Sequence, residues 1–258
     1  MKSLILSLSC ICCAANLLAL TASDDASNYG GWSDGSNQGS GFLDWSLNSS
    51  GGTSGFGGHF IGNSTDGAGN INTGTNQSFG MYANLDSGAF STAIRSFGSA
   101  LSVNDEFSFK MGVNFDNGNK GFNLRVAGDS IFNFNVGGGG SVSSANATLN
   151  AGSGAGYDYG GNDAMLDAVI RVIGADTIEY EISRISSQGN QGVLFSGTVS
   201  DIAGSIDNFE FYVSGTDNGD DQNNLYVNSF SVSEVPEPSA FALLAGVTAL
   251  ALLVRRRR

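Results

Sequence analysis

The sequence predicts an all-β protein, built as a two-sheet antiparallel jelly-roll sandwich. Apolar and polar residues alternate in many short segments, and Gly, Asn, Asp and Ser fill the gaps between them. The chain has 38 glycines and 17 phenylalanines but only two prolines, both close to the C-terminus. Because more than ten strands are expected and no convincing amphipathic helix is found, the pattern favours a large sandwich over an immunoglobulin-like one.

The clearest strand covers 107–115, where Phe, Met and Val at odd positions alternate with mostly polar residues at even positions. The segments 122–126, 178–182 and 209–213 alternate in the same way, and each predicts a strand with one buried face. Turns such as 116–119 carry Asp, Asn and Gly, which tolerate the positive φ of hairpins. Further strands are expected at His59–Asn63, Ser78–Asn84, Ala89–Phe97, Ile131–Val136, Ala168–Ile173, Gly192–Val199 and Leu225–Val232.

The first 23 residues have the features of a secretory signal peptide. Lys2 precedes an apolar run from Leu4 to Leu20, and small residues follow at Thr21-Ala22-Ser23. We expect cleavage after Ala22 or Ser23 and a β-sandwich domain over residues 24–233. All three cysteines lie inside the predicted signal peptide, so the domain must be stabilised by its core or by metal ions and not by disulfides.

Residues 234–258 form a tail of three parts. A short motif, Val235, Pro236, Glu237 and Pro238, is kept extended by its prolines. An apolar run over 239–254 follows, which would form a helix of about 24 Å. Snorkelling and local thinning of the membrane can make up the difference from a hydrocarbon core of about 30 Å. The chain then ends with a basic stop, Arg255, Arg256, Arg257 and Arg258.

The basic stop predicts a C-terminus held on the cytoplasmic side of a membrane. A core helix of a soluble domain is the alternative for 239–254, but nothing follows this run that could pack it. The order of motif, apolar run and arginines resembles the PEP-CTERM sorting signal of Gram-negative bacteria. The resemblance implies insertion in the inner membrane, cleavage near the motif by an exosortase-like enzyme, and delivery to the cell surface or extracellular space. The resemblance concerns where the protein is sorted and implies no activity.

The domain itself loosely resembles concanavalin A-like lectin and glucanase sandwiches, in the segments Gly58–Asn63, Ser78–Asn84 and Leu225–Val232. This second resemblance implies polysaccharide as a partner. Six of the 11 basic residues but all 24 acidic residues lie between Asp24 and Glu237, which gives this part of the chain a net charge of −18. Such a surface excludes nucleic acid as a partner, because phosphate binding needs a basic footprint. Solubility is the preferred explanation of the charge, and binding of divalent cations is the other.

The sequence offers little catalytic chemistry. His59 is the only histidine, and no Gly-x-Ser-x-Gly motif occurs, so a nucleophilic triad is not expected. Glu179 and Glu181 share one face of a strand, about 7 Å apart, within the range of roughly 5–9.5 Å that glycosidases use. The Glu-x-Asp-x-x-Glu signature of lectin-like glucanases is absent, and a solvated face with Arg184 nearby is the preferred interpretation. We therefore predict that the protein has no catalytic residues and no cofactor and is not an enzyme.

Two loops are rich in oxygen ligands, Asp217–Asn224 and, more weakly, Asp66–Asn72. Ca²⁺ takes six to eight such oxygens, but the EF-hand spacing is missing, so an Asn/Asp-rich turn is preferred and no metal site is assigned. Exposed aromatic rings could stack on sugars. The candidates for stacking are Trp32, Trp45, Tyr82, Tyr157, Tyr159 and Tyr212. Tyr212 is the preferred one, because it lies on the polar side of the strand 209–213, and most of the others could equally anchor the core or a loop.

The sequence thus predicts an exported, non-catalytic β-sandwich protein of the cell surface or extracellular matrix, with carbohydrate binding as its candidate activity. Two alternatives stay open: a polysaccharide-degrading enzyme on the same fold, and a purely structural matrix protein.

Overall fold

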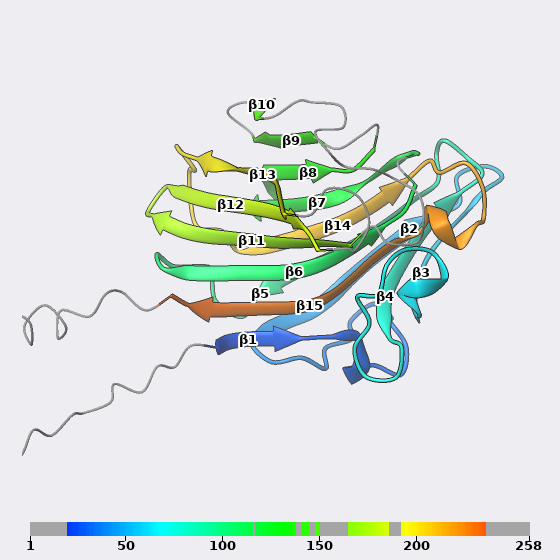
Figure 1. The fold of residues 1–258 in the computed structure, drawn as a ribbon, viewed down its shortest axis with the longest axis horizontal. Helices are drawn as coiled ribbons and strands as arrows, with labels where there is room; N and C mark the ends of the chain where they lie inside the picture. Colours follow the sequence, from blue (N-terminus) through cyan, green and yellow to red (C-terminus); the bar gives the residue numbers. More distant parts are fainter. Residues whose placement is uncertain are drawn as a thin grey trace, which may run out of the picture.

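The computed structural model describes residues 20–115, 117–137, 141–144, 148–149, 165–185 and 192–235. They form two antiparallel sheets (Figure 1), which confirms the predicted all-β, two-sheet architecture. Most of the predicted signal peptide and all of the tail after Val235 lie outside these residues, as do Tyr157 and Tyr159. In the described part of the chain, no helix is long and apolar enough to cross a membrane.

The first sheet has β13 at one edge and β3 at the other. Strand β1 also belongs to it and pairs with β15 beyond the end of β4. In spatial order the strands are β13 (Gly192–Val199), β12 (Thr177–Arg184), β11 (Met165–Gly174), β6 (Asp105–Val113), β15 (Leu225–Glu234), β4 (Ser78–Asn84) and β3 (Phe56–Gly62), with β1 (Leu20–Asp24) off this path.

The second sheet lies behind the first in Figure 1. Its strands follow the order β10 (Thr148–Leu149), β9 (Ser141–Ser144), β8 (Asp129–Asn135), β7 (Asn119–Val126), β14 (Asn208–Ser214), β5 (Phe90–Phe97) and β2 (Phe42–Ser50). Three single turns of 3₁₀ helix connect strands in the described residues, η1 (Ala26–Asn28), η2 (Ser64–Asp66) and η3 (Asp221–Asn223).

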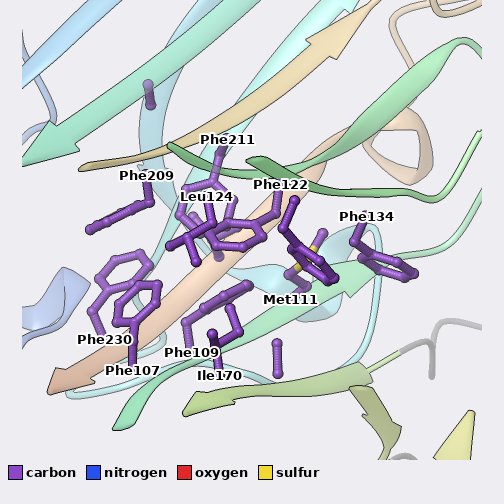
Figure 2. Packing of buried hydrophobic residues seen from close by; sticks show 14 of the residues in the cluster. Phe107, Phe109, Met111, Phe122, Leu124, Phe134, Ile170, Phe209, Phe211 and Phe230 are labelled. Atoms are coloured by element: carbon purple, nitrogen blue, oxygen red, sulfur yellow. The ribbon is translucent and has the colours of Figure 1, made fainter. Parts of the chain in front are cut away.

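The core between the sheets is rich in phenylalanine (Figure 2). Phe107 and Phe109 of β6 project toward the second sheet, where Phe122 of β7 and Phe209 of β14 meet them. The ring centroids are 4.5 Å apart for Phe109 and Phe122, and 4.8 Å apart for Phe107 and Phe209. The predicted inward faces of these strands are therefore correct, and aromatic contacts of this kind add to the burial of apolar area.

Strand β1 crosses the predicted boundary between signal peptide and domain. Its residues pair with the end of β15, from Leu20 opposite Ser233 to Asp24 opposite Phe230. Ala22 and Asp24 are both 3% exposed. Residues before 24 are therefore an integrated part of the first sheet.

The chain between β3 and β4 folds over the outer face of the first sheet. Ala68 and Ile71 of this segment pack on Tyr226 of β15, together with Phe60 of β3 and Met165 of β11. This cover forms a second, small apolar cluster on the side of the sheet away from the main core.

Candidate functional site

One cavity, of about 360 Å³, is lined by β3, β4 and the loop before β15. Figure 1 shows this loop, with η3 as the orange coil, beside β3 and β4. We call the cavity the edge cavity, because β3 is the last strand of the first sheet. Its lining residues are His59, Phe60, Tyr82, Asn84, Gly219, Asp221 and Asn224.

Two aromatic rings form the apolar wall of the edge cavity. In the antiparallel register Phe60 lies opposite Gly80, and Tyr82 lies opposite Gly58. A Cβ at Gly80 would lie 2.2 Å from the ring of Phe60, and one at Gly58 would lie 2.6 Å from the hydroxyl of Tyr82. The two glycines therefore leave room for each ring to lie across the neighbouring strand, with 6.2 Å between the ring centroids.

Two asparagines form the polar wall, and both are deeply buried. Asn84 is 7% exposed and Asn224 is 5% exposed. Thr216 donates a hydrogen bond to Oδ1 of Asn84 (2.6 Å), while Nδ2 of Asn84 has no partner among the described residues. Nδ2 of Asn224 donates only long bonds, 3.3 Å to Oδ1 of Asp221 and 3.4 Å to the hydroxyl of Tyr226.

Unused hydrogen-bonding groups therefore line the edge cavity. Within the described chain, Oδ1 of Asn224 and Oδ2 of Asp221 have no partner, like Nδ2 of Asn84. None of these three atoms is among the fully buried polar atoms that lack a partner, and Asp221 is exposed, so water or a ligand can reach them from the cavity. A donor and two acceptors beside two rings can bind a ligand that has both hydroxyl groups and apolar faces.

The two oxygen-rich loops predicted separately meet beside this cavity. A Cβ at Gly67 would lie 2.0 Å from the carbonyl oxygen of Asp221, so the loops pack backbone against backbone. Burial raises the pKa of Tyr226 to about 12, and the nearby charges of Asp221 and Asp66 add to this effect.

Several carboxylates of these loops are used by the loops themselves. Asp220 accepts from the backbone N–H of Gln222 and caps η3, and Asp217 accepts from the amide of Asn117. In the described part of the chain no three acidic, histidine or cysteine side chains form a group that could hold a metal ion.

His59 contributes to the framework of the cavity. Its Nε2 lies 2.9 Å from the carbonyl oxygen of Thr92, which can only accept, so Nε2 carries the proton. Its ring meets Trp32 edge-on at 5.2 Å, and burial lowers the pKa of the imidazole. The bond to Thr92 links β3 of the first sheet to β5 of the second.

Of the predicted stacking residues in the described chain, only Tyr82 lies at the cavity. Trp32 and Trp45 are not available for stacking, since they are 6% and 1% exposed and pack on each other inside the core, which confirms the alternative that they anchor the core. Tyr212 lies on the outer face of β14, but its hydroxyl accepts from Asn133 and its burial raises its pKa to about 12. The indole ring is apolar enough that core packing competes with surface stacking at any tryptophan.

Sequence reasoning missed Phe60, Asn84 and Thr216 as site residues. The Gly-x-aromatic pattern that occurs both at 58–60 and at 80–82 was an available signal. Its meaning depends on the pairing of β3 with β4, which no local pattern specifies.

The pair Glu179 and Glu181 lies elsewhere, on the outer face of β12. Arg171 of β11 donates to Glu179 (3.4 Å) and to Glu106 (2.6 Å). Arg184 was expected near the face of the two glutamates, and this was wrong. It is 2% exposed and follows Ser183 on the strand, so its side chain lies on the opposite, inward face of β12. The basic neighbour of this face is Arg171, because it lies opposite Glu179 in the β11–β12 pairing.

Comparisons with known proteins give similarity of fold alone. No family model and no curated protein matches the chain. A sialidase is 11% identical with a TM-score of 0.48, over 86% of this chain and 19% of the sialidase. The exoplasmic/lumenal domain of VIP36, in a form bound to Ca²⁺ and Man3GlcNAc, is 9% identical with a TM-score of 0.42, over 76% of this chain and 88% of that domain.

A carbohydrate esterase from the Shiga toxin-encoding bacteriophage phi24B is 13% identical with a TM-score of 0.42, over 74% of this chain and 90% of the esterase. These structures require one correction. The prediction that the chain is not an enzyme was wrong to exclude catalysis, because a sialidase and an esterase occur beside a glycan-bound domain among the similar folds.

Proposed function

We propose that this chain is an exported protein of the cell surface or extracellular matrix, with a jelly-roll-type sandwich that binds carbohydrate at the edge cavity. The observation that carries the proposal is the pairing of the rings of Tyr82 and Phe60 with unused amide and carboxylate groups. Pyranose rings have apolar C–H faces and hydroxyl edges, so they need this combination of partners.

The contacts suggest how a sugar would bind. One apolar face would lie on Tyr82, a hydroxyl oxygen would accept from Nδ2 of Asn84, and neighbouring hydroxyls would donate to Asp221 and Asn224. A polysaccharide contains the same sugar unit many times. The overall affinity can therefore be high even when each site binds weakly, provided that several domains bind one polymer.

Export is the second part of the proposal. The signal peptide would direct the chain across the inner membrane, where the apolar run 239–254 would hold it until an exosortase-like enzyme cuts near Val235–Pro238. Mass spectrometry of protein from the surface of the producing cells tests this part, and a chain that still carries Arg255–Arg258 there would contradict it.

Carbohydrate binding is tested with a panel of neutral and acidic polysaccharides, presented to the protein with and without Ca²⁺. We expect binding to at least one of them, and Tyr82→Ala should weaken it about tenfold, which is about 1.4 kcal/mol. Tyr82→Phe should bind nearly as well, since the ring is kept.

Asn84→Ala should also weaken binding, because it removes the unpaired donor. The matched control is Asn48→Ala, at an exposed position of β2 on the second sheet. Equal binding by all four variants would place the sugar elsewhere, and no binding to any polysaccharide would favour a purely structural matrix protein.

A further inference from the structure

The N-terminal strand β1 is held on three sides. Thr21 donates through its hydroxyl to the carbonyl of Val232 (3.3 Å), and Ser23 exchanges two backbone hydrogen bonds of 2.9 Å with Ser40. Gly41 has a φ of +73°, and a Cβ there would lie 2.6 Å from the side chain of Ala22. The segment after β1 therefore folds closely over the strand.

The last residue of β1 belongs to a buried ion pair. The side chains of Asp24 and Arg95 are both fully buried and in contact. Asp24 also accepts from the hydroxyl of Tyr29 (2.6 Å), while Arg95 donates to the carbonyl of Leu43 (2.8 Å) and to Oδ1 of Asn37 (2.6 Å). We call this group the ion-pair cluster.

A signal-peptide cut within β1 conflicts with this packing. Cleavage after Ser23 would place a new ammonium group on Asp24, inside the sandwich, where a charge that lacks designed partners is costly. Cleavage after Ala22 would remove Thr21 and Ala22 and leave the end of β15 without its paired strand, exposing unpaired backbone groups.

We propose that the signal peptide is cut before β1, between Ala15 and Asn16. Ala15 and Cys13 supply small residues at the two positions a signal peptidase reads, and the mainly apolar run 4–12 has nine residues, within the usual length of such runs. Water adds across the peptide bond, which leaves a carboxylate on Ala15 and an amine on Asn16. The chain that folds then keeps all of β1. This inference rests on the export part of the proposed function.

The full chain, expressed with its own signal sequence in a Gram-negative host, tests the proposal. Mass spectrometry of the exported protein should give Asn16 as the first residue. A first residue of Ser23 or Asp24 would overturn the proposal. A chain that still begins with Met1 would instead contradict export, so the two failures are distinguishable.

A matched pair of variants tests the bond itself, because a large side chain directly before a signal-peptidase cut prevents it. Ala15→Phe should leave the precursor uncut, whereas Ser23→Phe, at a partly exposed position of β1, should be processed like the unmodified chain. The reverse result, with Ser23→Phe uncut and Ala15→Phe processed, would overturn the proposal whether or not the products fold.

Discussion

The ion-pair cluster and the edge cavity are both polar groups buried in an apolar sandwich, but they differ in how they are satisfied. In the ion-pair cluster Asp24 accepts from Tyr29 and Asn28, Arg95 donates to Leu43 and Asn37, and the two charges meet each other. The guanidinium carbon of Arg95 also lies 4.9 Å from the ring centroids of both Phe42 and Trp45.

In the edge cavity, by contrast, Nδ2 of Asn84 and Oδ1 of Asn224 have no partner in the described chain, although neither atom is fully buried and both can be reached from the cavity. Burial alone therefore does not separate structure from function. The satisfied cluster fixes the N-terminal strand in place, and the unsatisfied one has binding capacity left for a ligand.

The largest expected effect is at the ion-pair cluster. Arg95→Met leaves the Asp24 carboxylate buried without its cation, and we expect a loss of about 3–5 kcal/mol of unfolding free energy. Denaturant unfolding measures it. Combining Arg95→Met with Asp24→Asn should recover part of the loss, because the uncompensated charge is gone. The control is Arg171→Ala, whose ion pairs are partly exposed and should contribute less than about 1 kcal/mol.

A substitution at the edge cavity should lower the free energy of unfolding much less. Asn84→Ala removes one hydrogen bond, from Thr216, and we expect a loss of about 1 kcal/mol or less. A loss as large as that of Arg95→Met would show that Asn84 is a structural residue and would weaken the comparison.

A smaller effect is expected from His59, which should make the free energy of unfolding depend on pH. Burial lowers the pKa of His59 below its ordinary value of 6.5, so the unfolded chain takes up a proton more readily than the folded one. The neutral His59 therefore contributes to folding stability at pH values above about 6.5, and this contribution is lost as the pH falls below that value. His59→Gln, which keeps a donor for Thr92, should unfold with a weaker pH dependence between about 7.5 and 5.5. An unchanged slope would contradict a neutral buried histidine.

The smallest expected effect concerns cations at the loop Asp217–Asn224. Because Asp217, Asp220 and Asp221 already accept hydrogen bonds within the protein, we expect Ca²⁺ to raise the melting temperature no more than Mg²⁺ at equal ionic strength. A rise specific to Ca²⁺ that Asp220→Asn removes would show that these carboxylates reorganise to bind the ion.

The sequence by itself determined the strands that alternate strongly. Two predicted strands, Ser78–Asn84 and Gly192–Val199, have the bounds that the structure gives them, and the inward faces around Phe109 and Phe211 are correct. Alternation is a local property, because successive side chains of a strand point to opposite faces whatever the partner strand is.

Only the tertiary structure decided which segments meet. β2 was missed because Ser and Asn occupy much of its sequence, and it is a strand because it pairs with β5. The sequence places the segment of β1 at the end of the predicted signal peptide, and only the structure shows its pairing with β15 and the contact of Asp24 with Arg95. The edge cavity needs β3, β4 and the loop before β15 together. These contacts join residues far apart in the chain, and their energy depends on partners that no local pattern contains.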